Sequence, residues 1–102
     1  MSPSDTLFLQ AAQLHQNGNL EAAKKCYLEF IQDHAEHPQA NYFLGMLWFQ
    51  LGKPMKALPL LEKASQLQPG SAQVKNDLGL VLAQLGQIAP AEQAYRQAIS
   101  LQ

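Results

Sequence analysis

The sequence has few of the residues that build sheets, disulfides or membrane spans. Val, Ile and Thr together supply six of the 102 residues, too few β-branched side chains to cover the faces of a sheet. Cys26 is the only cysteine, so an internal disulfide is excluded and a reducing compartment agrees with the composition. The longest apolar runs, such as 46–49, are far shorter than the ~20 residues that cross a bilayer. We therefore expect no membrane contact.

Charge is also sparse and mixed in sign. Seven Lys and Arg residues are scattered among eight Asp and Glu, and the formal net charge is −1. Without a basic run or stripe, nucleic acid is not an expected partner. The beginning of the chain lacks the basic start and the long apolar centre of a secretory signal, so we expect a cytoplasmic location.

Residue patterns that carry catalysis are missing as well. The sequence has no phosphate-cradling glycine loop, no Cys-x-x-Cys pair, no His-Glu-x-x-His and no nucleophile elbow. His34 and His37 have acidic neighbours and are potential metal ligands, but their polar stretch QDHAEHPQ is typical of solvent-exposed histidine. Cys26 has two lysine neighbours and no acid–base partner, which favours an inert thiol. We expect neither an enzyme nor a bound cofactor or metal.

The residues that are abundant favour helices. Leu, Ala and Gln supply 17, 14 and 14 residues, and all three are good helix formers. The chain is therefore expected to be all-helical, and its length suits a single domain with one modest core.

A repeat of fixed length organises the sequence. Gly18, Gly52 and Gly86 lie 34 residues apart. Three further positions recur in phase with these glycines: a bulky residue four before (Leu14, Trp48, Leu82), alanine five after (Ala23, Ala57, Ala91) and a large residue nine after (Tyr27, Leu61, Tyr95). Such self-similarity is the signature of a repeat architecture.

This pattern resembles the tetratricopeptide repeat, in which Leu-Gly, a turn glycine, an alanine, an aromatic residue and a closing proline recur. The stretch from Asn41 to Pro69 matches best, whereas Gln10-Ala11 and Ala35 depart from the pattern in the first repeat. The resemblance implies a right-handed α-solenoid of three helix-turn-helix repeats, at about 4–37, 38–71 and 72–102. Arrays of this kind usually finish with an extra capping helix, but this sequence stops at Gln102, so we expect no separate C-terminal capping helix. We also expect the chain to be an N-terminal part of a longer protein.

Residue spacing predicts six helices. They are expected at 3–17, 20–33, 39–51, 55–68, 72–85 and 89–101. Gly45 and Gly79 on first helices, opposite Ala57 and Ala91 on second helices, should allow close backbone approach. Pro59 removes an N–H from the fourth helix, which predicts a kink or a late start there.

The resemblance also implies a binding surface, because the first helices of such repeats line a concave face that holds peptides. The residues expected to face it are Phe8, His15, Gln16, Tyr42, Phe43, Met46, Phe49, Gln50, Asn76, Asp77 and Leu80. Aromatic and Met side chains ringed by amides are typical of binding hot spots. Tyr42 and Phe49 have an alternative role in packing between repeats. Three glutamines at one repeat position also have two possible roles: Gln16, Gln50 and Gln84. They either hydrogen-bond to the backbone of an extended ligand or are a row of solvated helix-forming residues.

One ligand of this family is disfavoured. Co-chaperones of the family hold the acidic tails of heat-shock chaperones with Lys, Asn and Arg side chains. The corresponding positions here contain no cation: Phe8, Ala12, Phe43, Gln73 and Asp77. A terminal carboxylate would be desolvated there without compensation.

Three functional classes follow. The preferred one is a non-enzymatic scaffold whose groove binds a protein segment or peptide. The second is the recognition domain of a larger bacterial enzyme, such as a glycosyltransferase or sulfotransferase. The third is a self-associating module, with a homodimer forming through a C-terminal apolar face of Val81, Leu85, Ile99 and Leu101.

Overall fold

The computed structural model describes residues 2–102, and these residues form six α-helices without a strand. The helices are α1 (Pro3–Gln16), α2 (Leu20–Asp33), α3 (Pro38–Gln50), α4 (Pro54–Leu67), α5 (Ala72–Gln84) and α6 (Ile88–Ser100). Each predicted helix is present, and each of its ends lies within one residue of the expected position.

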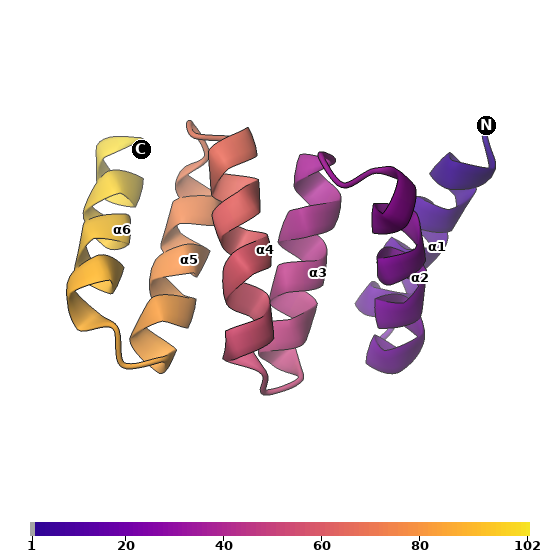
Figure 1. Cartoon of the computed structure of the whole chain (residues 1–102), viewed down its shortest axis with the longest axis horizontal. Helices are drawn as coiled ribbons and strands as arrows, with labels where there is room; N and C mark the ends of the chain where they lie inside the picture. The colour runs from indigo at the N-terminus through magenta and orange to yellow at the C-terminus, as the bar shows by residue number, and fades with distance from the viewer. Residues whose placement is uncertain (1) are drawn as a thin grey trace.

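The helices form three antiparallel pairs that stack along the long axis of the molecule (Figure 1). The molecule measures 40 × 26 × 21 Å along its principal axes. Within each repeat α1 packs on α2, α3 on α4 and α5 on α6, and between repeats α2 contacts α3 and α4 contacts α5. The first helices also meet in series, α1 with α3 and α3 with α5. The fold is therefore an α-solenoid of three repeats with one face lined by α1, α3 and α5.

Local sequence signals explain where the helices begin and end. Ser2 and Asp5 form a capping box at the start of α1, and the Ser71 hydroxyl accepts the Val74 N–H at the start of α5. The turns inside the repeats use Gly18, Gly52 and Gly86 at φ of 83°, 78° and 78°, a left-handed conformation that favours glycine. The glycine anchors of the repeat are thus turn residues, as the spacing predicted.

Pro59 lies inside α4 without delaying the start of the helix. The helix begins at Pro54 and continues to Leu67, so the predicted late start is wrong. Pro59 is exposed, and Met55, whose carbonyl loses its helical partner, is 72% exposed. Water can therefore hydrogen-bond to this carbonyl, which lowers the cost of the missing N–H.

Close approach of the paired helices depends on missing side chains. A Cβ placed on Gly45 would lie 3.0 Å from Leu61 Cγ, and one placed on Gly79 would lie 2.8 Å from the Tyr95 ring. Ala57 and Ala91 are buried in the same seams. The prediction that these small residues allow close approach of the paired helices is confirmed.

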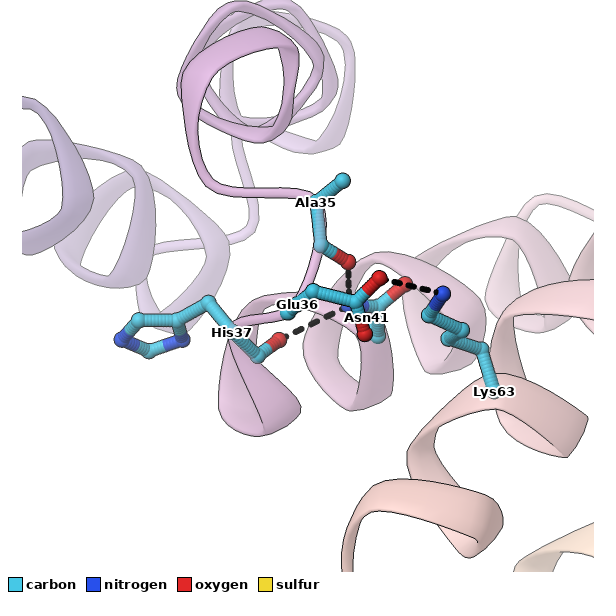
Figure 2. A network of polar contacts seen from close by, with 5 residues as sticks. All are labelled: Ala35, Glu36, His37, Asn41 and Lys63. Carbon is cyan, nitrogen blue, oxygen red and sulfur yellow. Dashed lines mark hydrogen bonds and ion pairs between the residues drawn. The ribbon is translucent and has the colours of Figure 1, made fainter.

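A polar network fixes the connection between the first two repeats (Figure 2). The Asn41 side-chain amide, which is 3% exposed, donates to the Ala35 carbonyl at 3.0 Å and to the His37 carbonyl at 2.8 Å. Lys63 Nζ lies 2.8 Å from Glu36 Oε1 and ties the same loop to α4. The loop is therefore held against both helices of the second repeat.

Candidate functional site

An open hollow of about 500 Å³ lies where α1 meets α3 on the face of the first helices. Its lining combines amide, imidazole and aromatic side chains: Ala12, His15, Gln16, Tyr27, Phe43 and Gln50. Four of these, His15, Gln16, Phe43 and Gln50, belong to the groove predicted from sequence. We call this hollow and its six lining residues the α1–α3 groove.

Residues on successive first helices meet at a constant separation of 35 positions. The rings of Phe8 and Phe43 have centroids 6.2 Å apart, and the equivalent pair one repeat later is Tyr42 with Asp77. His15 and Gln50 form a third pair of this separation. The first helices are therefore staggered by one residue relative to the 34-residue repeat.

A hydrogen bond joins the two rims of the groove. His15 Nε2 lies 2.5 Å from Gln50 Oε1, and because an amide oxygen only accepts, the imidazole nitrogen donates. The His15 ring also meets Tyr27 edge-on, with centroids 6.0 Å apart. Tyr27 comes from α2 and is almost fully buried at the floor of the groove, where burial raises the pKa of its hydroxyl to about 12.

Two lining residues, Ala12 and Tyr27, are not among the groove residues predicted from sequence, and Tyr27 is the one that comes from a second helix. It occupies the large-residue position of the repeat, which favours a core role. The available signal was its hydroxyl, because the equivalent position of the second repeat holds the fully apolar Leu61.

Asp77 is buried between repeats instead of facing the groove as a free carboxylate. It is 6% exposed and accepts hydrogen bonds from the Tyr42 hydroxyl at 2.5 Å and from Gln73 Nε2 at 2.9 Å. Burial, reinforced by the hydrogen bond to Asp77, raises the pKa of Tyr42 to about 12. The pair therefore connects α3 to α5 as a satisfied polar contact within the protein.

The aromatic cluster predicted at the middle of the groove also packs between repeats. Tyr42, Met46 and Phe49 are half-buried against the buried cluster of Ala57, Leu61 and Val81. Phe8 is half-buried in the same way against the core of the first repeat. The more exposed members of the predicted surface are Gln16, Gln50, Asn76 and Leu80.

The histidines between the first two repeats are half-buried, so their expected solvent exposure is wrong. His34 stacks on Phe30 with ring centroids 4.5 Å apart, and His37 meets the same ring at 5.1 Å. His37 Nδ1 also accepts the Ala40 N–H at the start of α3. The part of the chain that the structure describes has no group of three His, Cys, Asp or Glu placed to hold a metal ion.

The predicted C-terminal apolar face divides into two parts. Ile99 is 70% exposed and Leu101 is 42% exposed. Val81 is fully buried with Ala57 and Leu61, and Leu85 is half-buried against the same cluster. The assignment of Val81 to an uncovered surface is therefore wrong, because its side of α5 faces the preceding repeat. Among residues 2–102, no helix is long and apolar enough to cross a bilayer.

Paired helices, turn glycines and small residues in the seams define a helical-repeat protein. The sequence model of the tetratricopeptide repeat matches residues 9–54 and 49–102, which together include nearly the whole chain. The chain therefore belongs to the tetratricopeptide repeat family. No curated protein matches it significantly.

Solved structures share the fold at low sequence identity. The type III secretion translocator chaperone SycD of Yersinia enterocolitica, solved as an alternative dimer, is 20% identical with a TM-score of 0.87, over 96% of this chain and 74% of SycD. The second repeat domain of Spaghetti (RPAP3), bound to the HSP90 peptide SRMEEVD, is 17% identical with a TM-score of 0.90, over 97% and 92% of the two chains. MamA from AMB-1 is 16% identical with a TM-score of 0.92, over 98% of this chain and 55% of MamA.

Proposed function

We propose that this protein is an interaction scaffold that holds an uncharged, largely apolar peptide segment in the α1–α3 groove. The observation that carries the proposal is the lining of the groove, which has an aromatic floor, amide rims and no Lys, Arg, Asp or Glu. Aromatic anchors surrounded by adaptable polar groups are the usual anatomy of a protein-binding hot spot.

The lack of charge extends along the whole central helix. None of the 13 residues of α3 is Asp, Glu, Lys or Arg, and Asp5 of α1 is engaged in the capping box. A charged ligand group would lose its hydration here without gaining an ionic partner. This supports a ligand different from the acidic peptide SRMEEVD that the RPAP3 domain binds.

The polar groups of the groove suit a peptide backbone. The Gln16 amide, the Gln50 amide and the Tyr27 hydroxyl each donate and accept hydrogen bonds, and all three line the same hollow. An extended segment can present its N–H and C=O groups to them and its apolar side chains to Phe43. Main-chain hydrogen bonds then supply affinity, and the aromatic floor supplies selectivity.

The test uses a charge placed in the groove. Peptides selected from a random library against the wild-type chain are measured by calorimetry with Gln50→Lys and with Gln66→Lys. Both glutamines are exposed, but Gln66 lies on α4, outside the groove. We expect Gln50→Lys to weaken binding by about tenfold or more, while Gln66→Lys binds as wild type does. Equal binding by both variants would contradict the proposal.

Self-association is a second candidate function, and the observation that favours it is the exposure of Ile99 and Leu101. Both lie on or next to the last turn of α6, and each is a large aliphatic side chain. A second copy covering them would remove this apolar surface from water. We propose a closed dimer over an open filament, because closed two-fold symmetry is the commonest form of self-assembly.

A further inference from the structure

Three lysines from different elements converge on the single tryptophan. Trp48 is half-buried in the last turn of α3. The Nζ atoms of Lys24, Lys53 and Lys56 lie 5.0, 5.7 and 4.7 Å from the centroid of its ring. Lys24 belongs to α2 of the first repeat, whereas Lys53 and Lys56 lie at the start of α4. We call these four residues the Trp48 cluster.

The Trp48 cluster has more lysines than a favourable contact with the indole requires. One ammonium group near an indole is favourable, but each further one repels those already present. Lys24 has a carboxylate partner, Glu21 Oε2 at 2.7 Å, while neither Lys53 nor Lys56 forms an ion pair within residues 2–102. The three lysines and Glu21 carry a formal charge of +2, in a chain whose net charge is −1. The excess positive charge is therefore local and lacks a counter-charge.

The position of the lysines on α4 strengthens the positive potential. Lys53 is the N-cap residue of α4 and makes no side-chain cap, and the first turn of the helix contains no acidic residue. A helix N-terminus carries partial positive charge and normally attracts acidic side chains. Lysines at this end of the helix reduce its stability, and they increase the positive electrostatic potential at the surface. Consistently, Lys24 and, more weakly, Lys53 lower the pKa of Glu21.

We propose that the Trp48 cluster binds a run of acidic side chains on a partner protein, at a site separate from the α1–α3 groove. The ammonium groups come from different elements, α2 and the start of α4, so carboxylates spaced along a chain can pair with them in turn. The half-buried indole contacts the methylene groups of those acidic side chains. Lys24 belongs to one repeat and Lys53 to the next, so the partner bridges the first two repeats.

The test uses the tryptophan itself as the reporter. Trp48 is the only tryptophan, so its fluorescence emission monitors this site directly in the full chain. Hexaglutamate is titrated at low ionic strength, beside hexaglutamine, inorganic phosphate and a short oligothymidylate. We expect a saturable change with hexaglutamate that is lost at high salt, when screening weakens the attraction. Hexaglutamine should leave the emission unchanged.

Charge-neutral variants locate the site. The double variant Lys53→Gln, Lys56→Gln should bind hexaglutamate at least about tenfold more weakly, and circular dichroism should show unchanged helix content. The matched control is Lys75→Gln, on α5 and outside the cluster, which should bind as wild type does. No saturable response to hexaglutamate, equal weakening by Lys75→Gln, or tighter binding of phosphate or oligothymidylate would each overturn the proposal.

Discussion

Gly79 sets the distance between α5 and α6 by having no side chain. A Cβ at this position would lie 2.8 Å from two carbons of the Tyr95 ring, which is too rigid to yield locally. Overpacking of this kind costs about 1–3 kcal/mol, whereas replacing glycine by alanine inside a helix gains about 1 kcal/mol. We therefore expect Gly79→Ala to lower the free energy of unfolding by about 1 kcal/mol in urea denaturation.

Gly45→Ala provides the comparison at the equivalent position of the second repeat. A Cβ there would lie 3.0 Å from Leu61 Cγ and 3.3 Å from Leu60 Cβ, a smaller overlap than at Gly79, so the loss should be smaller. Equal or increased stability of Gly79→Ala would show that α5 and α6 separate at no cost.

Two tyrosines, Tyr27 in the core and the half-buried Tyr42, make the stability of the fold depend on alkaline pH. The folded protein holds the pKa of both Tyr27 and Tyr42 at about 12, above the ordinary value of 10.0, chiefly because burial disfavours the phenolate. A group whose pKa is raised on folding contributes its full stability below its unfolded pKa and loses it as the pH rises through the folded value. We expect stability to fall between pH 10 and 12.

Urea denaturation at a series of pH values measures this loss. Tyr42→Phe should be less stable than wild type near neutral pH, because Asp77 loses a hydrogen bond, yet it should lose less stability as the pH rises. A wild-type chain whose midpoint stays constant over this pH range would contradict the assignment of buried, protonated phenols.

At the scale of helices, α3 packs against the neighbouring repeat and also lines the α1–α3 groove. Phe49 is half-buried between repeats, while its neighbour Gln50 is exposed on the groove. We expect Phe49→Ala to lower the free energy of unfolding by about 2 kcal/mol, less than the 3–5 kcal/mol typical of a fully buried ring. Thermal denaturation followed by circular dichroism measures this.

Gln66→Ala, at an exposed position of α4, is the control for that measurement, since an exposed substitution changes stability by no more than about 0.5 kcal/mol. If Phe49→Ala is as stable as Gln66→Ala, the ring contributes nothing to the contact between repeats. Its role would then be confined to the groove.

The sequence alone predicts the six helices but not which residues of neighbouring repeats meet. Glycine spacing and apolar periodicity located all six helices, because both are local properties of the chain. The separation of 35 positions, which pairs His15 with Gln50 and Tyr42 with Asp77, arises from packing between repeats. No pattern within a single helix predicts this separation. Asp77 was therefore expected in the groove, and its burial against Tyr42 became clear only in the assembled solenoid.

The same limit applies to contacts among several elements. The repeat pattern identifies Trp48 as one of its recurring bulky residues, but the lysines around it are up to 24 positions away in the sequence. They meet only because α2, α3 and α4 begin or end at the same edge of the stack, at the bottom of the view in Figure 1. Conversely, Val81 was placed on the wrong side because periodicity does not say which neighbour a helix face meets.

At the scale of the whole molecule, the exposed aliphatic residues Ile99 and Leu101 at the end of α6 predict association. We expect the chain to form dimers at concentrations of about 100 μM, where contacts of micromolar affinity are populated. The double variant Ile99→Lys, Leu101→Lys should sediment as a monomer in analytical ultracentrifugation, because two cations replace the apolar contact. A wild-type chain that stays monomeric at that concentration would show that this face does not mediate self-association.

The stacked arrangement, in which each repeat touches only its neighbours, also determines how the chain acquires its structure. Within residues 2–102 the first and third repeats share no helix contact, so no contact requires the closure of a long loop. Helical proteins rich in such short-range contacts fold within ~μs to ms. Within residues 2–102 the second repeat packs against two others and the first and third against one each, so amides of the first and third repeats should exchange with solvent before those of α3 and α4. A partner that bridges the first two repeats would slow exchange in α2 and leave α6 unchanged.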